Sequence, residues 1–125
     1  MDKSPKSFRS AKVGSIHKID LAVPHLIDEA QIRSIFSELH AFATKDAKPF
    51  MVIDFASVAH MSSAALGALI KLDNEIRPKH GMLALSTINS QIMTVFKITK
   101  LDKHLHLFAT VADALDAVKK SHPEA

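Results

Sequence analysis

Two adjacent serines, Ser62 and Ser63, stand where an apolar stretch gives way to a run rich in alanine and leucine. Residues 50–59 (FMVIDFASVA) are typical of a buried strand and the turn after it, and residues 64–70 (AALGALI) are typical of a helix. A serine at a helix N-terminus accepts a hydrogen bond from a backbone N–H that has no partner within the helix, which contributes about 1 kcal/mol. One cap requires only one hydroxyl. Two interpretations therefore stay open: the serines only start the helix, or one of them is a site that another protein modifies.

A phosphate on one of these serines is compatible with a helix start. It would meet free N–H groups and the positive end of the helix dipole. A phosphoserine carries about −1.5 to −2 charges at neutral pH, and beside Met61, Ala65 and Leu66 this charge would enter a small apolar surface. A change of ~3 kcal/mol at an interface alters affinity more than a hundredfold. The sequence thus permits a binding switch that needs no refolding.

Other chemistry is weakly supported. A hydrolase that uses Ser62 or Ser63 ranks last, because no Gly-x-Ser-x-Gly elbow is present and His60 is too close in sequence to suggest a triad. His104 and His106 are the only closely spaced pair among eight histidines, and there is no cysteine, so we predict surface histidines and no metal site. The GxGxxG and Walker patterns are absent, so any nucleotide is expected on a partner. We predict no enzyme and no cofactor.

The elements that would position the two serines alternate along the chain. We expect one or two strands over residues 8–23, and a helix that begins at Asp28, which has the capping-box spacing to Gln31. Pro78 biases Arg77 away from helical geometry and Gly81 marks the exit from the helix after the serines. Further elements are predicted as strands over residues 50–55, 82–86 and 105–108, and as helices that begin near Asn89 or Ser90 and at Thr110. The pattern predicts an α/β domain with a small mixed four- to five-stranded sheet and about four helices.

The excess positive charge lies at one end of the chain. Residues 1–12 carry a net charge of +3, which is the whole formal net charge of the 125 residues. We expect a mobile basic tail over residues 1–12, one domain over residues 13–121 and a short C-terminal tail over residues 122–125. With no basic stripe and no Tyr or Trp, nucleic-acid binding is not favoured. The lack of cysteine, of a signal-peptide pattern and of an apolar run of ~18–20 residues predicts a cytoplasmic protein without membrane insertion.

The ordered motifs of residues 51–111 resemble the STAS domain of bacterial anti-sigma factor antagonists, and the resemblance extends over roughly residues 13–120. The residues in register with the family pattern are Asp54, Val58, Ser63, Leu66, Gly67, Gly81, Thr99, Leu101, Asp102 and Phe108. Three positions depart from it: Ser62 replaces the usual Asp, Ala64 the following Ser, and Ala65 the first loop Gly.

The resemblance implies a regulatory cycle. The unphosphorylated protein would bind an anti-sigma factor that is also a serine kinase, and so free a sigma factor. The kinase, which binds the ATP, would phosphorylate Ser63 and end the interaction, and a serine phosphatase would reset it. Because Ser62 replaces the carboxylate, Ser62 is the second candidate acceptor. The expected contact surface is Met61, Ser62, Ser63, Ala65, Leu66 and Gly67.

Two aspartates, Asp28 and Asp54, correspond to positions of the family pattern, but we expect each of them to stabilise the local backbone. Asp28 is the nearest counterpart of an acidic residue near the family's phosphorylation site, and it is kept as a candidate contact residue although we favour the N-cap. Asp54 is expected to fix the turn after its strand. A rival interpretation of the whole chain is a constitutive STAS scaffold or accessory subunit of a signalling or transporter complex, with which the altered serine loop is compatible.

Overall fold

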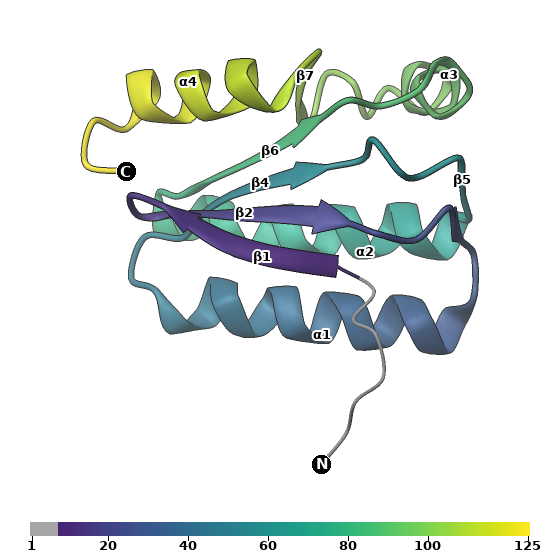
Figure 1. Ribbon diagram of the computed structural model, residues 1–125, viewed down its shortest axis with the longest axis horizontal. Helices are drawn as coiled ribbons and strands as arrows, with labels where there is room; N and C mark the ends of the chain where they lie inside the picture. The colour runs from purple at the N-terminus through teal and green to yellow at the C-terminus, as the bar shows by residue number, and fades with distance from the viewer. Residues whose placement is uncertain (1–7) are drawn as a thin grey trace.

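The computed structural model describes residues 8–125, which form one α/β domain (Figure 1). A five-stranded sheet has the order β1-β2-β4-β6-β7, in which β1 and β2 are antiparallel and all other neighbours are parallel. Its strands are β1 (Phe8–Val13), β2 (Ile16–Leu21), β4 (Phe50–Asp54), β6 (Met82–Ser86) and β7 (His106–Phe108). This mixed sheet confirms the predicted fold class.

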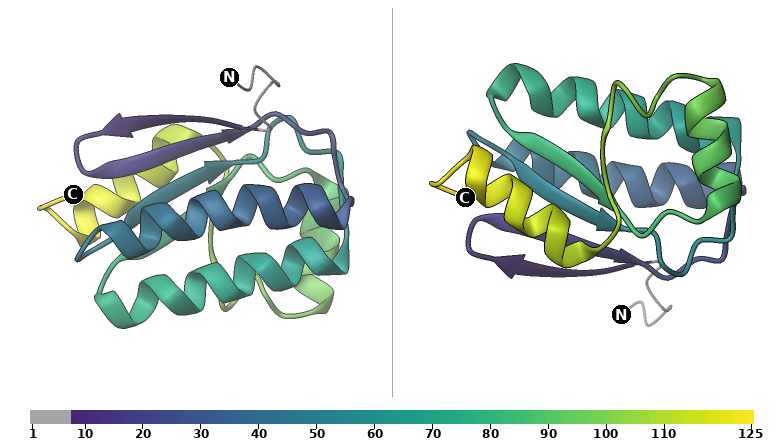
Figure 2. Two further views of the ribbon diagram at one scale, coloured as in Figure 1. Left: turned by 90° about the horizontal axis from the view of Figure 1, so that it is seen from below. Right: turned by 90° about the horizontal axis from the view of Figure 1, so that it is seen from above.

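Three long helices cover the two faces of the sheet. The helices α1 (Glu29–Lys45) and α2 (Ser63–Ile76) lie side by side on one face, and α4 (Val111–Ser121) lies on the other (Figures 1 and 2). The central strand β4 is buried on both sides: Met51 and Ile53 pack into the cluster with α1 and α2, whereas Phe50 and Val52 pack into the cluster with α4. This two-sided burial explains the nearly continuous apolar run of that strand.

A second, two-stranded parallel sheet pairs β3 (His25–Leu26) with β5 (His60–Met61). It lies beyond the end of the main sheet from which α1 and α2 begin, near α3 (Ser90–Ile98) (Figure 1). Two strands of two residues each carry no sequence periodicity, and the sequence did not predict them. Their pairing joins the connection from β2 to α1 with the connection from β4 to α2.

The helix starts agree with the predicted caps. The side chains of Asp28, Ser62, Asn89 and Thr110 each accept a hydrogen bond from the backbone N–H three residues later. These contacts are local in sequence, which is why the spacing of residue types predicted them. Arg77 is an exception to the predicted helix end: its backbone is helical (φ −56°, ψ −48°), and a 3-10 turn over Arg77–Lys79 follows α2 directly. The residue with left-handed backbone geometry that ends this turn is His80, with φ 63°.

The predicted N-terminal tail needs correction within the described residues. Strand β1 begins at Phe8, which is 2% exposed and contacts Phe42 edge-on, so residues 8–12 are not a tail. Strand β1 lies at the edge of the sheet, and its residues 9–12 are exposed. Their polar composition therefore resembles that of a solvated tail, although they belong to a strand. The remainder of the predicted tail lies outside the described residues. At the other end, Ala125 packs against the cluster under α4, and Glu124 forms an ion pair with Lys48 at 3.2 Å.

Candidate functional site

The two serines have different structural roles at the start of α2. Ser62 has an extended backbone, and its Oγ accepts a hydrogen bond from the Ala65 N–H at 3.3 Å. The backbone N–H of Ser62 in turn donates to the Leu26 carbonyl at 3.0 Å, which ties the cap to β3. Ser62 is half-buried and is the N-cap of the helix.

Ser63 is the first residue of α2 and is exposed. Its hydroxyl has no hydrogen-bond partner in the part of the chain that the structure describes. The first turn of α2 contains no acidic residue, so no side-chain charge offsets the positive end of the helix dipole there. A phosphate on Ser63 would be placed beside free N–H groups of this turn.

The surface around Ser63 is small and mostly apolar. Met61 and Leu66 are half-buried, and Ala64 and Gly67 are exposed. A side chain at position 67 would meet no atom within 4 Å, so Gly67 leaves open space on the outer side of the helix. An open groove between α1 and α2 continues from this surface, lined by Ala64, Gly67 and Ala68 from α2 and by Arg33, Ser37 and His40 from α1.

Ala65 does not belong to this surface, contrary to the expectation from the sequence. It is 0% exposed and lies in the core with Leu69, Leu72 and Ile76. These four residues follow one another at spacings of four, three and four, so the inward face of α2 begins at Ala65. The side chain of Ala65 therefore has no surface to offer a partner.

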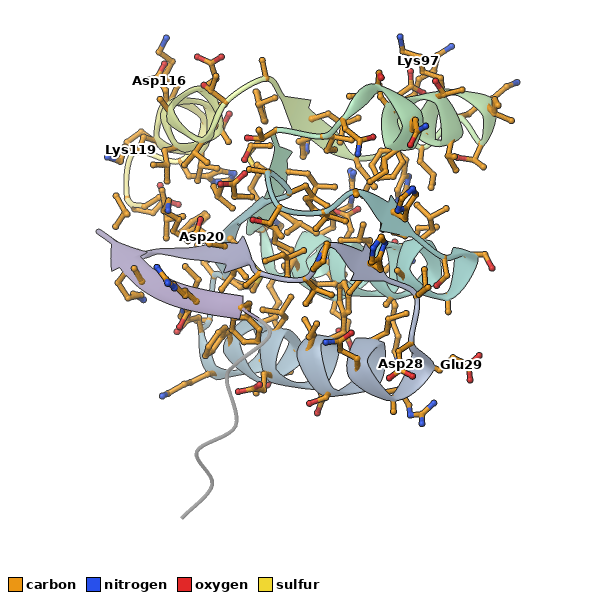
Figure 3. All side chains as sticks on the ribbon, turned by 45° about the vertical axis from the view of Figure 1, so that its right-hand side comes forward. Asp20, Asp28, Glu29, Lys97, Asp116 and Lys119 are labelled. Atoms are coloured by element: carbon orange, nitrogen blue, oxygen red, sulfur yellow. The ribbon has the colours of Figure 1, made fainter. Side chains whose placement is uncertain are left out.

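The two aspartates have the structural roles expected for them. An oxygen of Asp28 accepts a hydrogen bond from the Gln31 N–H at 2.8 Å, and Asp28 is exposed at the N-terminal end of α1 (Figure 3). Because α1 and α2 begin at the same end of the sheet, Asp28 lies at the same edge of the molecule as the serines (Figure 1). Asp54 accepts a hydrogen bond from the Ala56 N–H at 3.0 Å and so fixes the turn after β4.

The predicted pair His104 and His106 belongs to a different region, at the C-terminal end of α2. Nε2 of His104 lies 3.4 Å from Asp73, a buried carboxylate that also accepts a hydrogen bond from Nε of Arg77 at 2.6 Å. Arg77 donates a second hydrogen bond to the backbone carbonyl of His104. Partial desolvation and then the Arg77 guanidinium lower the pKa of His106 from its ordinary value, against the opposing effect of Asp73.

The structure brings together two histidines that the sequence left apart. Nδ1 of His25 lies 2.9 Å from Nδ1 of His60, across the β3–β5 pair. The two residues are 35 positions apart and belong to no motif, so only knowledge of this strand pairing could have revealed their contact. Within residues 8–125, no set of three or more His, Cys, Asp or Glu side chains is arranged to hold a metal ion. None of the described helices is long and apolar enough to span a membrane.

Solved structures with the same fold come from both bacteria and mammals. An anti-sigma-factor antagonist (STAS) domain protein from Planctomyces limnophilus is 19% identical, with a TM-score of 0.81 over 92% of this chain and 99% of that one. The Bacillus cell fate determinant SpoIIAA in its phosphorylated form is 20% identical, with a TM-score of 0.70 over 89% of this chain and 98% of that one. The mouse anion transporter Slc26a9 is 16% identical, with a TM-score of 0.72 over 90% of this chain but only 19% of the transporter.

At these identities the structural matches establish the fold alone. The family is established independently, because the STAS domain model matches residues 12–114, which covers most of the chain. The match includes the serine loop, the helix after it and the strand pairing that positions them. This chain belongs to the STAS domain family.

Proposed function

We propose that this protein is an anti-sigma factor antagonist whose binding is switched by phosphorylation of Ser63. The observation that carries the proposal is the division of roles between the serines. Ser62 is held in the cap, while the hydroxyl of Ser63 is exposed and makes no hydrogen bond within the described residues. A kinase can therefore reach Ser63 without breaking the helix start.

The unphosphorylated protein binds an anti-sigma factor that is also a serine kinase. The contact surface is Met61, Ser62, Ser63, Leu66 and Gly67, with Asp28 at its edge and Ala65 removed from the expected set because it is buried. Gly67 leaves room for a partner to approach the helix backbone closely. Likeness in fold to SpoIIAA, which has been solved in an unphosphorylated form as the anti-sigma factor antagonist and in a phosphorylated form, supports this proposal.

Phosphorylation ends the interaction by adding charge to an apolar contact surface. The partner supplies ATP, the Ser63 oxygen forms a bond to the γ-phosphorus, and the bond to the ADP oxygen breaks, while the serine proton leaves to a base on the kinase. The phosphate is stabilised on this chain by the N-terminus of α2, but at the interface its charge of about −1.5 to −2 must be desolvated. A serine phosphatase restores the binding form, and the whole cycle takes place in the cytoplasm.

The test is fragmentation mass spectrometry of the protein isolated from its native cells, on the tryptic peptide that contains residues 61–71. A phosphate on Ser63 in part of the population is the expected result. A phosphate on Ser62 would keep the switch but overturn the residue assignment. Full coverage of the peptide without phosphate, under growth and under stress, would overturn the switch and favour a constitutive scaffold or accessory subunit, a role consistent with the similar domain within Slc26a9.

A further inference from the structure

His25 and His60 meet edge to edge on the surface of the β3–β5 pair. Their Nδ1 atoms are 2.9 Å apart, the ring centres are 5.0 Å apart and the ring planes differ by 14°. Because the nitrogens are much closer than the ring centres, both Nδ1 atoms lie between the rings. When both imidazoles are neutral, one Nδ1 carries a hydrogen and the other accepts it.

The backbone holds this arrangement in place. The carbonyl of Pro24 accepts hydrogen bonds from the N–H groups of Ala59 and His60, at 2.8 Å and 3.1 Å, and Ser62 donates to the Leu26 carbonyl at 3.0 Å. Leu26 is 0% exposed, so the neighbouring His25 points outward on the same strand. The two imidazoles are thus exposed groups on fixed strand positions, which is the kind of support that a preorganised site needs.

We propose that His25 and His60 form a two-histidine site for a transition-metal cation, of the group Cu²⁺, Ni²⁺ and Zn²⁺. Neutral imidazole is the commonest metal ligand in proteins. With metal–nitrogen bonds of about 2.0–2.1 Å, two nitrogens 2.9 Å apart reach one ion at an angle of about 90° at the metal. Such an angle suits square-planar or octahedral coordination, which Cu²⁺ and Ni²⁺ adopt.

Binding requires one change of tautomer and a rotation of both imidazoles, so that their Nδ1 lone pairs turn from one another toward a common ion, and it needs no oxidant. The hydrogen between the rings moves to Nε2 of the ring that carries it, both Nδ1 lone pairs then bind the cation, and a neutral pair releases no net proton. Two side chains fill two coordination positions, since the described residues offer no third ligand of the His, Cys, Asp or Glu type. Water or a group from a bound protein fills the others.

A cation at this position would add a metal bridge between two connections that are otherwise joined by backbone hydrogen bonds and by the contact of the two imidazoles. His25 precedes α1 by a short segment, and His60 lies two residues before Ser62, the N-cap of α2. The site would therefore hold the start of both helices at the edge where Ser63 lies. The proposal does not depend on phosphorylation, and its test does not involve the serines.

The test uses the untagged full chain at neutral pH, titrated with ZnCl₂ and observed by long-range ¹H–¹⁵N spectra of the imidazoles. We expect the Nδ1 resonances of His25 and His60 to shift together, before those of the other six histidines. In calorimetric titrations Cu²⁺ should bind more tightly than Ni²⁺ or Zn²⁺. The proposal would be wrong if the resonances of other histidines shifted first, or if no histidine resonance shifted at millimolar Zn²⁺.

Three variants complete the test. His25→Ala and His60→Ala should each weaken binding by at least about tenfold, and both side chains are exposed, so both variants should fold. His80→Asn is the matched control: His80 is exposed like the pair but lies outside it, and asparagine tolerates its positive φ of 63°. Equal weakening in His80→Asn, or unchanged affinity in His25→Ala and His60→Ala, would contradict the assignment. The spectra of the unaltered chain decide the question even if one variant misfolds.

Discussion

The Oγ atom of Ser62 accepts a hydrogen bond from the backbone N–H of Ala65 at 3.3 Å. This contact assigns the cap to the first serine, and it leaves the hydroxyl of the second free to react. Ser62 and Ala65 also mark the two sides of the helix start, because Ser62 is half-buried at the surface while Ala65 is fully buried. In the switch that we propose, stability and regulation thus depend on different residues within one turn.

Ser62→Ala should destabilise the protein and Ser63→Ala should not. Loss of the cap costs about 1 kcal/mol, whereas an exposed side chain without partners changes the free energy of unfolding by less than about 0.5 kcal/mol. Urea unfolding followed by circular dichroism measures both. Ser62→Asp, which keeps an acceptor at the cap, is the control and should stay close to the unaltered protein. Equal losses for the two alanine variants would contradict the assignment of the cap.

Ser63→Ala should hold the anti-sigma factor permanently, and Ser63→Asp should bind it more weakly, because the aspartate brings a charge to the apolar contact surface. The comparison is made by calorimetry or biolayer interferometry with the kinase-type anti-sigma factor that the proposed function requires as the partner. Ser10→Asp adds the same charge at an exposed serine of strand β1 and should leave the affinity unchanged. Equal affinities of Ser63→Ala and Ser63→Asp would count against the switch.

Two glycines should respond to alanine with opposite signs. Gly67 lies inside α2, where an added methyl group would meet no atom within 4 Å, so Gly67→Ala should stabilise the protein by about 0.5–1 kcal/mol. A Cβ at Gly81 would lie 1.9 Å from the carbonyl oxygen of Pro49, so Gly81→Ala must displace backbone and should cost about 2 kcal/mol. Thermal unfolding distinguishes them, and a shift of Tm in the same direction for both would refute the explanation.

Arg77→Leu should be among the more damaging surface substitutions. Asp73 is 1% exposed, and without Arg77 its carboxylate keeps only His104, at 3.4 Å, among the residues that the structure describes. Removal of one partner from a fully buried pair costs about 3 kcal/mol, and because the Arg77 side chain is 45% exposed we expect a smaller loss, of about 1–2 kcal/mol. The double variant Asp73→Leu with Arg77→Leu removes the buried charge as well and should recover much of that loss. A double variant less stable in urea than Arg77→Leu alone would show that the pair contributes more than charge compensation.

Acid should weaken the fold partly through His106. Its pKa is lowered in the folded protein, so the unfolded chain takes up the proton first as the pH falls through the ordinary value of 6.5. The stabilising contribution of His106 to the free energy of unfolding is therefore present above pH 6.5, and it is lost as the pH falls toward the lowered pKa of this group. His106→Gln should reduce the loss of stability between pH 7 and pH 5, measured by urea midpoints.

The predictable parts of this molecule are those that depend on near neighbours in the sequence. The caps at Asp28, Asn89 and Thr110 and the buried strands β4 and β6 follow from spacing and apolar runs. The burial of Ala65 could also have been found, since Ala65 continues the series of Leu69, Leu72 and Ile76. Alanine is small enough to suit either face of a helix, and this is why composition alone misplaced it.

The remainder depends on contacts between distant segments. Strands β3 and β5 consist of two residues each and exist because they pair with one another, so neither has a pattern of its own. The contact of His25 with His60 depends entirely on that pairing. The polar composition of β1 made its N-terminal boundary hard to predict, because Phe8 is the only buried residue of this strand.

The polar composition of β1 also affects how copies of this chain meet. Within residues 8–125 its outer side is an unpaired edge of the sheet, which could accept a strand from a second molecule and so begin aggregation. Arg9 and Lys12 are exposed on this strand, and two such edges brought together would place like charges close to one another. The positive charge that raises the isoelectric point of the chain thereby also acts as a gatekeeper against intermolecular sheet growth.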